Sequence, residues 1–102
     1  MEPVYDVVWP TPPQGTQARR PAPRLDDLHG KRIALLWDYV FRGDELFDVL
    51  ARELRRRFDG VEIVDYGTFG NLHGPHDREL VRALPAALAT HRVDGVVSGN
   101  GC

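Results

Sequence analysis

The chain has 102 residues, a formal net charge of −2, and 42% hydrophobic and 27% charged residues, which describes one small globular domain. The near-neutral charge excludes a basic surface for nucleic acid, and no apolar run approaches the roughly 20 residues of a membrane span. The acidic start, MEPVYDVVWP, does not fit a secretory signal, so we expect a cytoplasmic protein without nucleic-acid or membrane partners.

Residues 1–24 are predicted to form a proline-rich leader that acts as a docking arm. Six of the eight prolines lie here: Pro3, Pro10, Pro12, Pro13, Pro21 and Pro23. Proline fixes φ and lacks an N–H group, so the leader should be extended and irregular. Its apolar segment Val4–Trp9 should dock as a short strand or arm, on this chain or on a partner; the alternative is an unattached tail.

Three apolar segments of residues 25–102 are predicted to be β-strands. They are Arg32–Leu36, Val61–Tyr66 and Val93–Ser98. The first is a nearly continuous apolar run, which is typical of a strand buried on both faces in a parallel sheet. In the second, alternation should place Val61 and Ile63 on one face and Val64 and Tyr66 on the other.

Two helices are predicted between these strands. The first opens at Gly43-Asp44 and ends at Asp59-Gly60, with Gly60 as its C-cap. Its apolar stripe is Leu46, Leu50, Leu54 and Phe58, with Phe47 and Ala51 beside it. The second helix runs from about Asp77 to Thr90, and Pro85 should kink or break it.

This alternation predicts an α/β fold, a βαβαβ half of a parallel sheet that is flavodoxin- or Rossmann-like in kind. If each strand is added on the same side of the previous one, right-handed crossovers place both helices on one face of the sheet. The other face would then be bare, unless the strand order reverses or the leader covers it. The third strand has no following helix, and about 78 residues make only a small core. We therefore expect another chain or a missing C-terminal half to complete the sheet.

Three segments should meet at the carboxyl ends of the strands, where open parallel sheets bind ligands. They are 37–43, 67–76 and 98–102. The middle segment contains three glycines, which let a backbone approach a ligand, and the amides of the next helix could hold an anion. No phosphate-binding fingerprint is present, and the sequence identifies no cofactor. The alternative for this segment is a mobile connecting loop.

Asp38, His73 and His76 are candidate proton-transfer groups at these strand ends. Asp38 could equally be a satisfied capping residue. The two histidines have no third ligand fixed by spacing, so we expect them to face solvent or substrate rather than a metal ion. The candidate substrate-binding residues on these segments are Tyr39, Thr68 and Asn71.

The last segment, Ser98-Gly99-Asn100-Gly101-Cys102, contains the single cysteine. Two glycines flank Asn100, and such a turn would present the Cys102 thiol close to amide donors, which lower a thiol pKa, whereas the terminal carboxylate raises it. Cys102 is therefore a candidate catalytic thiol; the alternative is an incidental cysteine on a frayed end. The candidate substrate-binding residues beside it are Ser98, Gly99, Asn100 and Gly101.

These segments resemble the N-terminal part of the UGSC family. The likeness covers about Pro23–Cys102 and is carried by Leu28–Leu36, the first leucine-rich helix, Val61–Val64 and Asp94–Cys102. The proline-rich leader also fits. The family is named for a selenocysteine-Gly-Ser-Cys motif, often Cys-Gly-Ser-Cys, just after the third strand, and it is similar to selenoprotein reductase subunits.

In that family the motif would directly follow Gly99-Asn100-Gly101-Cys102, and here it does not. A stop at a selenocysteine codon, a natural split into two subunits, and cleavage beside Cys102 would each explain the departure. The resemblance implies a subunit or N-terminal portion of an enzyme with a thiol or selenol site for a small molecule, with a second polypeptide as partner. Thiol–disulfide or reductive chemistry is favoured; the alternatives are a lyase or hydratase subunit and a non-catalytic scaffold or regulatory subunit.

Overall fold

The computed structural model of the chain describes residues 2–11 and 15–99. The elements are β1 (Arg32–Leu36), α1 (Gly43–Arg57), β2 (Glu62–Val64), the 3₁₀ turn η1 (Tyr66–Thr68), α2 (Asp77–Thr90) and β3 (Gly95–Ser98). All three strands are parallel, so the predicted α/β class and the parallel sheet are confirmed. Neither helix has the length and apolar character that crossing a membrane requires.

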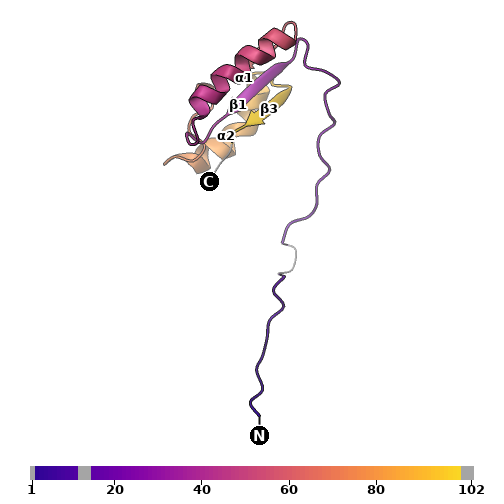
Figure 1. Cartoon of the computed structure of the whole chain (residues 1–102), viewed down its shortest axis with the longest axis vertical. Helices are drawn as coiled ribbons and strands as arrows, with labels where there is room; N and C mark the ends of the chain where they lie inside the picture. Colours follow the sequence, from indigo (N-terminus) through magenta and orange to yellow (C-terminus); the bar gives the residue numbers. More distant parts are fainter. Residues whose placement is uncertain (1, 12–14, 100–102) are drawn as a thin grey trace.

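The strand order is β2–β1–β3, so β1 is the central strand. Ile33 is in register with Ile63 on one side and with Gly95 on the other. The chain moves from β1 to β2 in one direction and from β2 to β3 in the other, and this reversal places α1 and α2 on opposite faces of the sheet (Figure 1). Each face therefore has one helix, rather than both helices sharing a face.

Alternate residues of β1 build two core layers. On the α1 side, Leu35 and Trp37 pack with Phe47, and on the α2 side Ala34 and Leu36 pack with Phe69. Half-buried side chains extend both layers: Leu50, Ile63, Tyr66 and Val97 on the first, and Leu72, Leu84, Ala87, Leu88 and Val93 on the second. This two-sided burial explains why β1 is a nearly continuous apolar run.

The rotation of α1 differs from the predicted stripe. The structure buries Phe47 and Ala51, whereas Leu46 is 61% exposed and Leu50 and Leu54 are half-buried. The apolar arc of α1 is wider than the sheet beneath it, and the Phe47 ring takes the central position against Leu35 and Trp37. One edge of the arc is consequently left in water.

Several element ends also differ from the prediction. The C-cap of α1 is Phe58, in extended conformation, and Gly60 (φ 72°) instead supplies the left-handed position of the turn before β2. β2 is shorter than predicted because the chain enters η1, which returns Tyr66 to the α1 side with Ile63. β3 begins at Gly95, and α2 is not divided at Pro85.

The described part of the leader extends away from the sheet and helices (Figure 1). Residues 2–11 and 15–27 are exposed, and the chain measures 76 × 32 × 25 Å along its principal axes. The radius of gyration is 19.8 Å, compared with about 13 Å for a compact chain of 100 residues. The described part of the leader therefore does not dock on its own chain, and docking on a partner stays a prediction.

Candidate functional site

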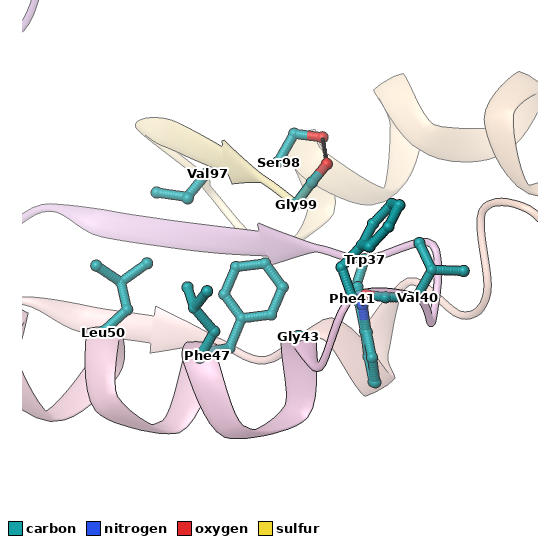
Figure 2. A pocket seen from close by; sticks show the side chains of 10 residues that line it. Trp37, Val40, Phe41, Gly43, Phe47, Leu50, Val97, Ser98 and Gly99 are labelled. Atoms are coloured by element: carbon teal, nitrogen blue, oxygen red, sulfur yellow. Dashed lines mark hydrogen bonds between the residues drawn. The ribbon is translucent and has the colours of Figure 1, made fainter. Parts of the chain in front are cut away.

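A cavity of about 130 Å³ lies at the carboxyl ends of β1 and β3. Its walls are Trp37, Val40, Phe41, Gly43, Leu46, Phe47, Leu50, Val97, Ser98 and Gly99. Figure 2 shows Phe47 and Leu50 rising from α1 toward the strands, with the β1–α1 loop at one end of the cavity. Since the crossover from β1 leads to β2 while β3 flanks the other side, this crevice is the switch point at which α/β sheets bind ligands.

The cavity is small and mostly apolar. Pockets for drug-sized ligands measure about 300–1,000 Å³, so 130 Å³ holds only a few heavy atoms. The polar side chain in its wall is Ser98, whose hydroxyl lies 3.4 Å from the Gly99 carbonyl oxygen. The described residues therefore form a small apolar cavity rather than an enclosed pocket for a drug-sized ligand.

The loop between β1 and α1 has a strained backbone. Tyr39, Phe41 and Arg42 have φ values of 65°, 59° and 53°, in the left-handed region that side chains with a Cβ atom disfavour. Each such residue costs about 1–2 kcal/mol. Strain of this kind persists only where the surroundings enforce it, and it concentrates at functional sites.

Contacts with Trp37 hold this loop in its strained conformation. The indole Nε1 donates a hydrogen bond to the Val40 carbonyl oxygen at 2.8 Å, and the indole ring stacks on Tyr39 with centroids 4.4 Å apart. A Cβ atom on Gly43 would lie 2.5–2.6 Å from the indole Cε2 and Cδ1 atoms. The loop can therefore close against the ring only because position 43 has no side chain.

Tyr66 completes the aromatic wall around Trp37. The two rings meet edge to face at 4.8 Å, and Phe47 lies 5.8 Å from Tyr66. Burial raises the pKa of the Tyr66 hydroxyl, and the nearby carboxylates of Asp65, Asp48 and Asp44 raise it further. Tyr66 is therefore a neutral phenol at physiological pH, and this edge of the site is acidic.

The end of β3 forms part of the cavity wall through Val97, Ser98 and Gly99. The Gly99 amide donates to the Leu36 carbonyl oxygen at 2.8 Å, which carries the β1–β3 pairing one residue further. A Cβ atom on Gly99 would approach Phe47 Cζ to 3.3 Å and Trp37 Cδ1 to 3.4 Å. Ser98 is exposed. The predicted residues Asn100, Gly101 and Cys102 lie outside the described residues.

The loop after β2 meets the end of β1 through its backbone. The Leu72 amide donates to the Trp37 carbonyl oxygen at 3.4 Å, so Asp38 and His73 each follow directly after this contact. Asp38 is half-buried, and the Asn71 side chain accepts a hydrogen bond from the His73 amide at 3.0 Å. This loop and the β1–α1 loop are thus neighbours, although neither Asp38 nor His73 lines the cavity.

The remaining predicted residues lie away from the cavity wall. Tyr39 packs behind it on Trp37, and Thr68 and His76 are exposed. His76 is the N-cap residue of α2, with Nδ1 3.9 Å from a Glu79 carboxylate oxygen. The first turn of α2 is acidic, and the Asp77 carboxylate accepts from the Arg78 amide at 2.8 Å, so this terminus is poorly suited to the predicted anion.

Within residues 2–11 and 15–99, no three His, Cys, Asp or Glu side chains are grouped so that they could hold a metal ion. Comparison with protein-family models matches the UGSC family over residues 6–102. The chain belongs to the UGSC family. No curated protein and no solved structure matches it.

The UGSC match includes part of the leader and the residues that follow β3. In this UGSC chain the sequence predicts that segment 37–43 lies at the strand ends, but the patterns that predict this do not identify Gly43 or Phe47 as lining residues. Both line the cavity and both touch the Trp37 environment. A signal for Gly43 was present, since glycine at the first position of a helix has a propensity cost that a close approach can explain.

Proposed function

We propose that the chain is a subunit or the N-terminal portion of a thiol-dependent enzyme that acts on a small molecule at the carboxyl ends of the strands. The observation that supports this proposal is the cavity between the ends of β1 and β3. From its wall at Gly99, three residues of sequence lead to Cys102. Ligands of open α/β sheets bind at such a switch point.

The site needs more protein than the described residues supply. The order β2–β1–β3 is the one with which flavodoxin-like sheets begin, and such sheets continue on the far side of β3. Within the described residues β3 pairs with β1 alone, so its other edge has no partner strand there. A second polypeptide that adds a strand beside β3 would bury this edge and enlarge the cavity.

The proposed chemistry uses the Cys102 thiolate beside a thiol or selenol of the second polypeptide. When two thiols form a disulfide they release two electrons and two protons, and the substrate accepts them. Asp38 and His73 or His76 are the proposed proton-transfer groups. The proposal includes a cytoplasmic setting, because that compartment keeps thiols reduced.

The thiol can be tested without knowing the substrate, because Cys102 is the only cysteine. We expect the rate of alkylation by iodoacetamide to rise with pH around a midpoint below about 8.5, the usual thiol pKa. The same chain unfolded in urea is the matched control, with its terminal carboxylate intact. Equal midpoints in the folded and unfolded chains would contradict an activated thiol.

The contact between Leu72 and Trp37 favours one alternative, a lyase or hydratase, because it brings the neighbours Asp38 and His73 to the same edge. In the complex purified from its own host, Cys102→Ala should abolish thiol chemistry. His73→Asn and His76→Asn should instead remove a histidine-linked limb of the pH profile if acid–base catalysis operates. Full activity in all three variants would identify a scaffold or regulatory subunit.

A further inference from the structure

The outward side of α1 carries an apolar groove of about 620 Å³. Phe41, Leu46 and Val49 line it and are 64%, 61% and 54% exposed, with half-buried Leu50 beside them. Its remaining lining residues are charged: Arg42, Glu45 and Glu53. This α1 groove is the part of the helix's apolar arc that the three-stranded sheet does not cover.

The leader contains a second exposed apolar surface, the segment Val4–Trp9. Its five apolar side chains are between 78% and 93% exposed: Val4, Tyr5, Val7, Val8 and Trp9. Pro3 and Pro10 bound it, so six residues without proline can form an uninterrupted extended arm. Valine, tyrosine and tryptophan favour that conformation.

The direction of the leader favours a partner in trans, because its described residues 2–11 and 15–24 are exposed and do not pack on their own domain (Figure 1). Residues 10–24 contain five prolines, and 15 residues of polyproline-like chain span about 45 Å. Helix α1, with 15 residues, is only about 22 Å long. A spacer of this length is long enough for the arm to reach the α1 of a neighbouring molecule, and the described part of the leader extends away from its own α1 (Figure 1).

We propose that two copies of this chain exchange arms, so that Val4–Trp9 of each copy lies in the α1 groove of the other. In a two-fold symmetric dimer each groove is filled by the arm of the other copy, so the assembly is closed and no groove or arm is left to bind a third copy. With about 150–250 Å² for each aromatic side chain and less for each valine, one arm removes roughly 500 Å² from water. Two arms and the two grooves they cover bury about 2,000 Å², the area of a stable interface.

The exchange is separate from the proposed enzyme activity, because it uses neither Cys102 nor the outer edge of β3. It also has a consequence for the site, since Phe41, Leu46 and Leu50 line both the α1 groove and the cavity. A docked arm would cover that shared wall from outside.

The first test is the mass of the full chain in solution, measured by sedimentation equilibrium between about 2 and 200 µM in a Cys102→Ser background that excludes disulfide dimers. We expect a reversible dimer of twice 11.5 kDa. Trp9→Asp in the arm and Leu46→Asp in the groove should each reduce the association constant at least tenfold. Val81→Asp, at an exposed position of α2 (53%), is the matched control and should leave the dimer unchanged. Circular dichroism checks that each variant remains folded.

A mixing experiment separates arm exchange from other contacts. The Trp9→Asp chain keeps its groove and the Leu46→Asp chain keeps its arm. An equimolar mixture can therefore form a heterodimer with one intact arm–groove contact, and it should associate more tightly than either variant alone. A monomeric parent chain at every concentration, a dimer that survives both substitutions, or a mixture that does not associate would overturn the proposal.

Discussion

Replacing Gly43 with alanine tests the central packing of the site. The new Cβ atom would lie 2.5–2.6 Å from two atoms of the Trp37 indole, whereas ordinary contacts are 3.4–4 Å, so the ring or the helix must move by about 1 Å. Trp37 is only 8% exposed and is held by the Val40 hydrogen bond and the Tyr39 stack. Overpacking of this kind costs about 1–3 kcal/mol, and the better helix propensity of alanine returns less than about 1 kcal/mol.

Urea unfolding followed by Trp37 fluorescence measures this loss, in a Trp9→Phe background that removes the exposed second tryptophan. A core of this size supplies about 3–5 kcal/mol, and urea m-values are near 1 kcal/mol/M, so a net loss of about 1–2 kcal/mol should lower the midpoint by about 1–2 M. Gly67→Ala is the matched control, because a Cβ atom there meets nothing within 4 Å and the residue is not left-handed. A Gly43→Ala midpoint equal to or above that of the parent chain would refute the assigned packing.

Three further outcomes are expected. Phe47→Ala, at a position 3% exposed, should cost about 3–5 kcal/mol and leave the chain largely unfolded by circular dichroism, whereas Val81→Ala should cost less than about 0.5 kcal/mol. Arg92→Gly should raise the urea midpoint by the equivalent of about 0.5–1 kcal/mol, because Arg92 (φ 52°) occupies the left-handed position after α2. There the Arg92 amide donates to the Ala89 carbonyl oxygen and the Val93 amide donates to the Leu88 carbonyl oxygen, which is a Schellman motif. An unchanged midpoint would contradict this account. Because the pKa of Tyr66 is raised in the folded chain, the unfolded chain loses the Tyr66 proton first as pH rises. The contribution of Tyr66 to the free energy of unfolding is therefore complete below about pH 10 and is lost as pH rises through the folded pKa. Tyr66→Phe should flatten this alkaline decline in stability, and equal slopes of stability against pH in the two chains would contradict the burial of Tyr66.

The sequence predicted the elements whose signals are local. The apolar run Arg32–Leu36 became β1, and the leucine stripe between Asp77 and Thr90 became α2, both with the predicted bounds. Alternation of strand and helix was sufficient to predict parallel pairing, because a crossover of this length returns the chain in the same direction. β3 ends at Ser98 as predicted, and Ser98 and Gly99 line the cavity, while their predicted role in substrate binding stays a prediction.

Features that depend on distant contacts could not be predicted in this way. Periodicity showed that α1 is amphipathic, but the fit of the Phe47 ring between Leu35 and Trp37 decided its rotation and left Leu46 exposed. A turn that no strand pattern signals returned Tyr66 to the α1 side.

By itself the sequence determined the class of fold and the order of its elements along the chain, because hydrophobic period and turn residues act over a few positions. Only the tertiary structure decided the order β2–β1–β3, since a crossover can reach either neighbour of β1. That order places β3 beside β1 and so creates the crevice between their ends, and the close approach of Trp37 to Gly43 shapes the crevice wall. Both depend on how segments come together in three dimensions, which local patterns do not encode.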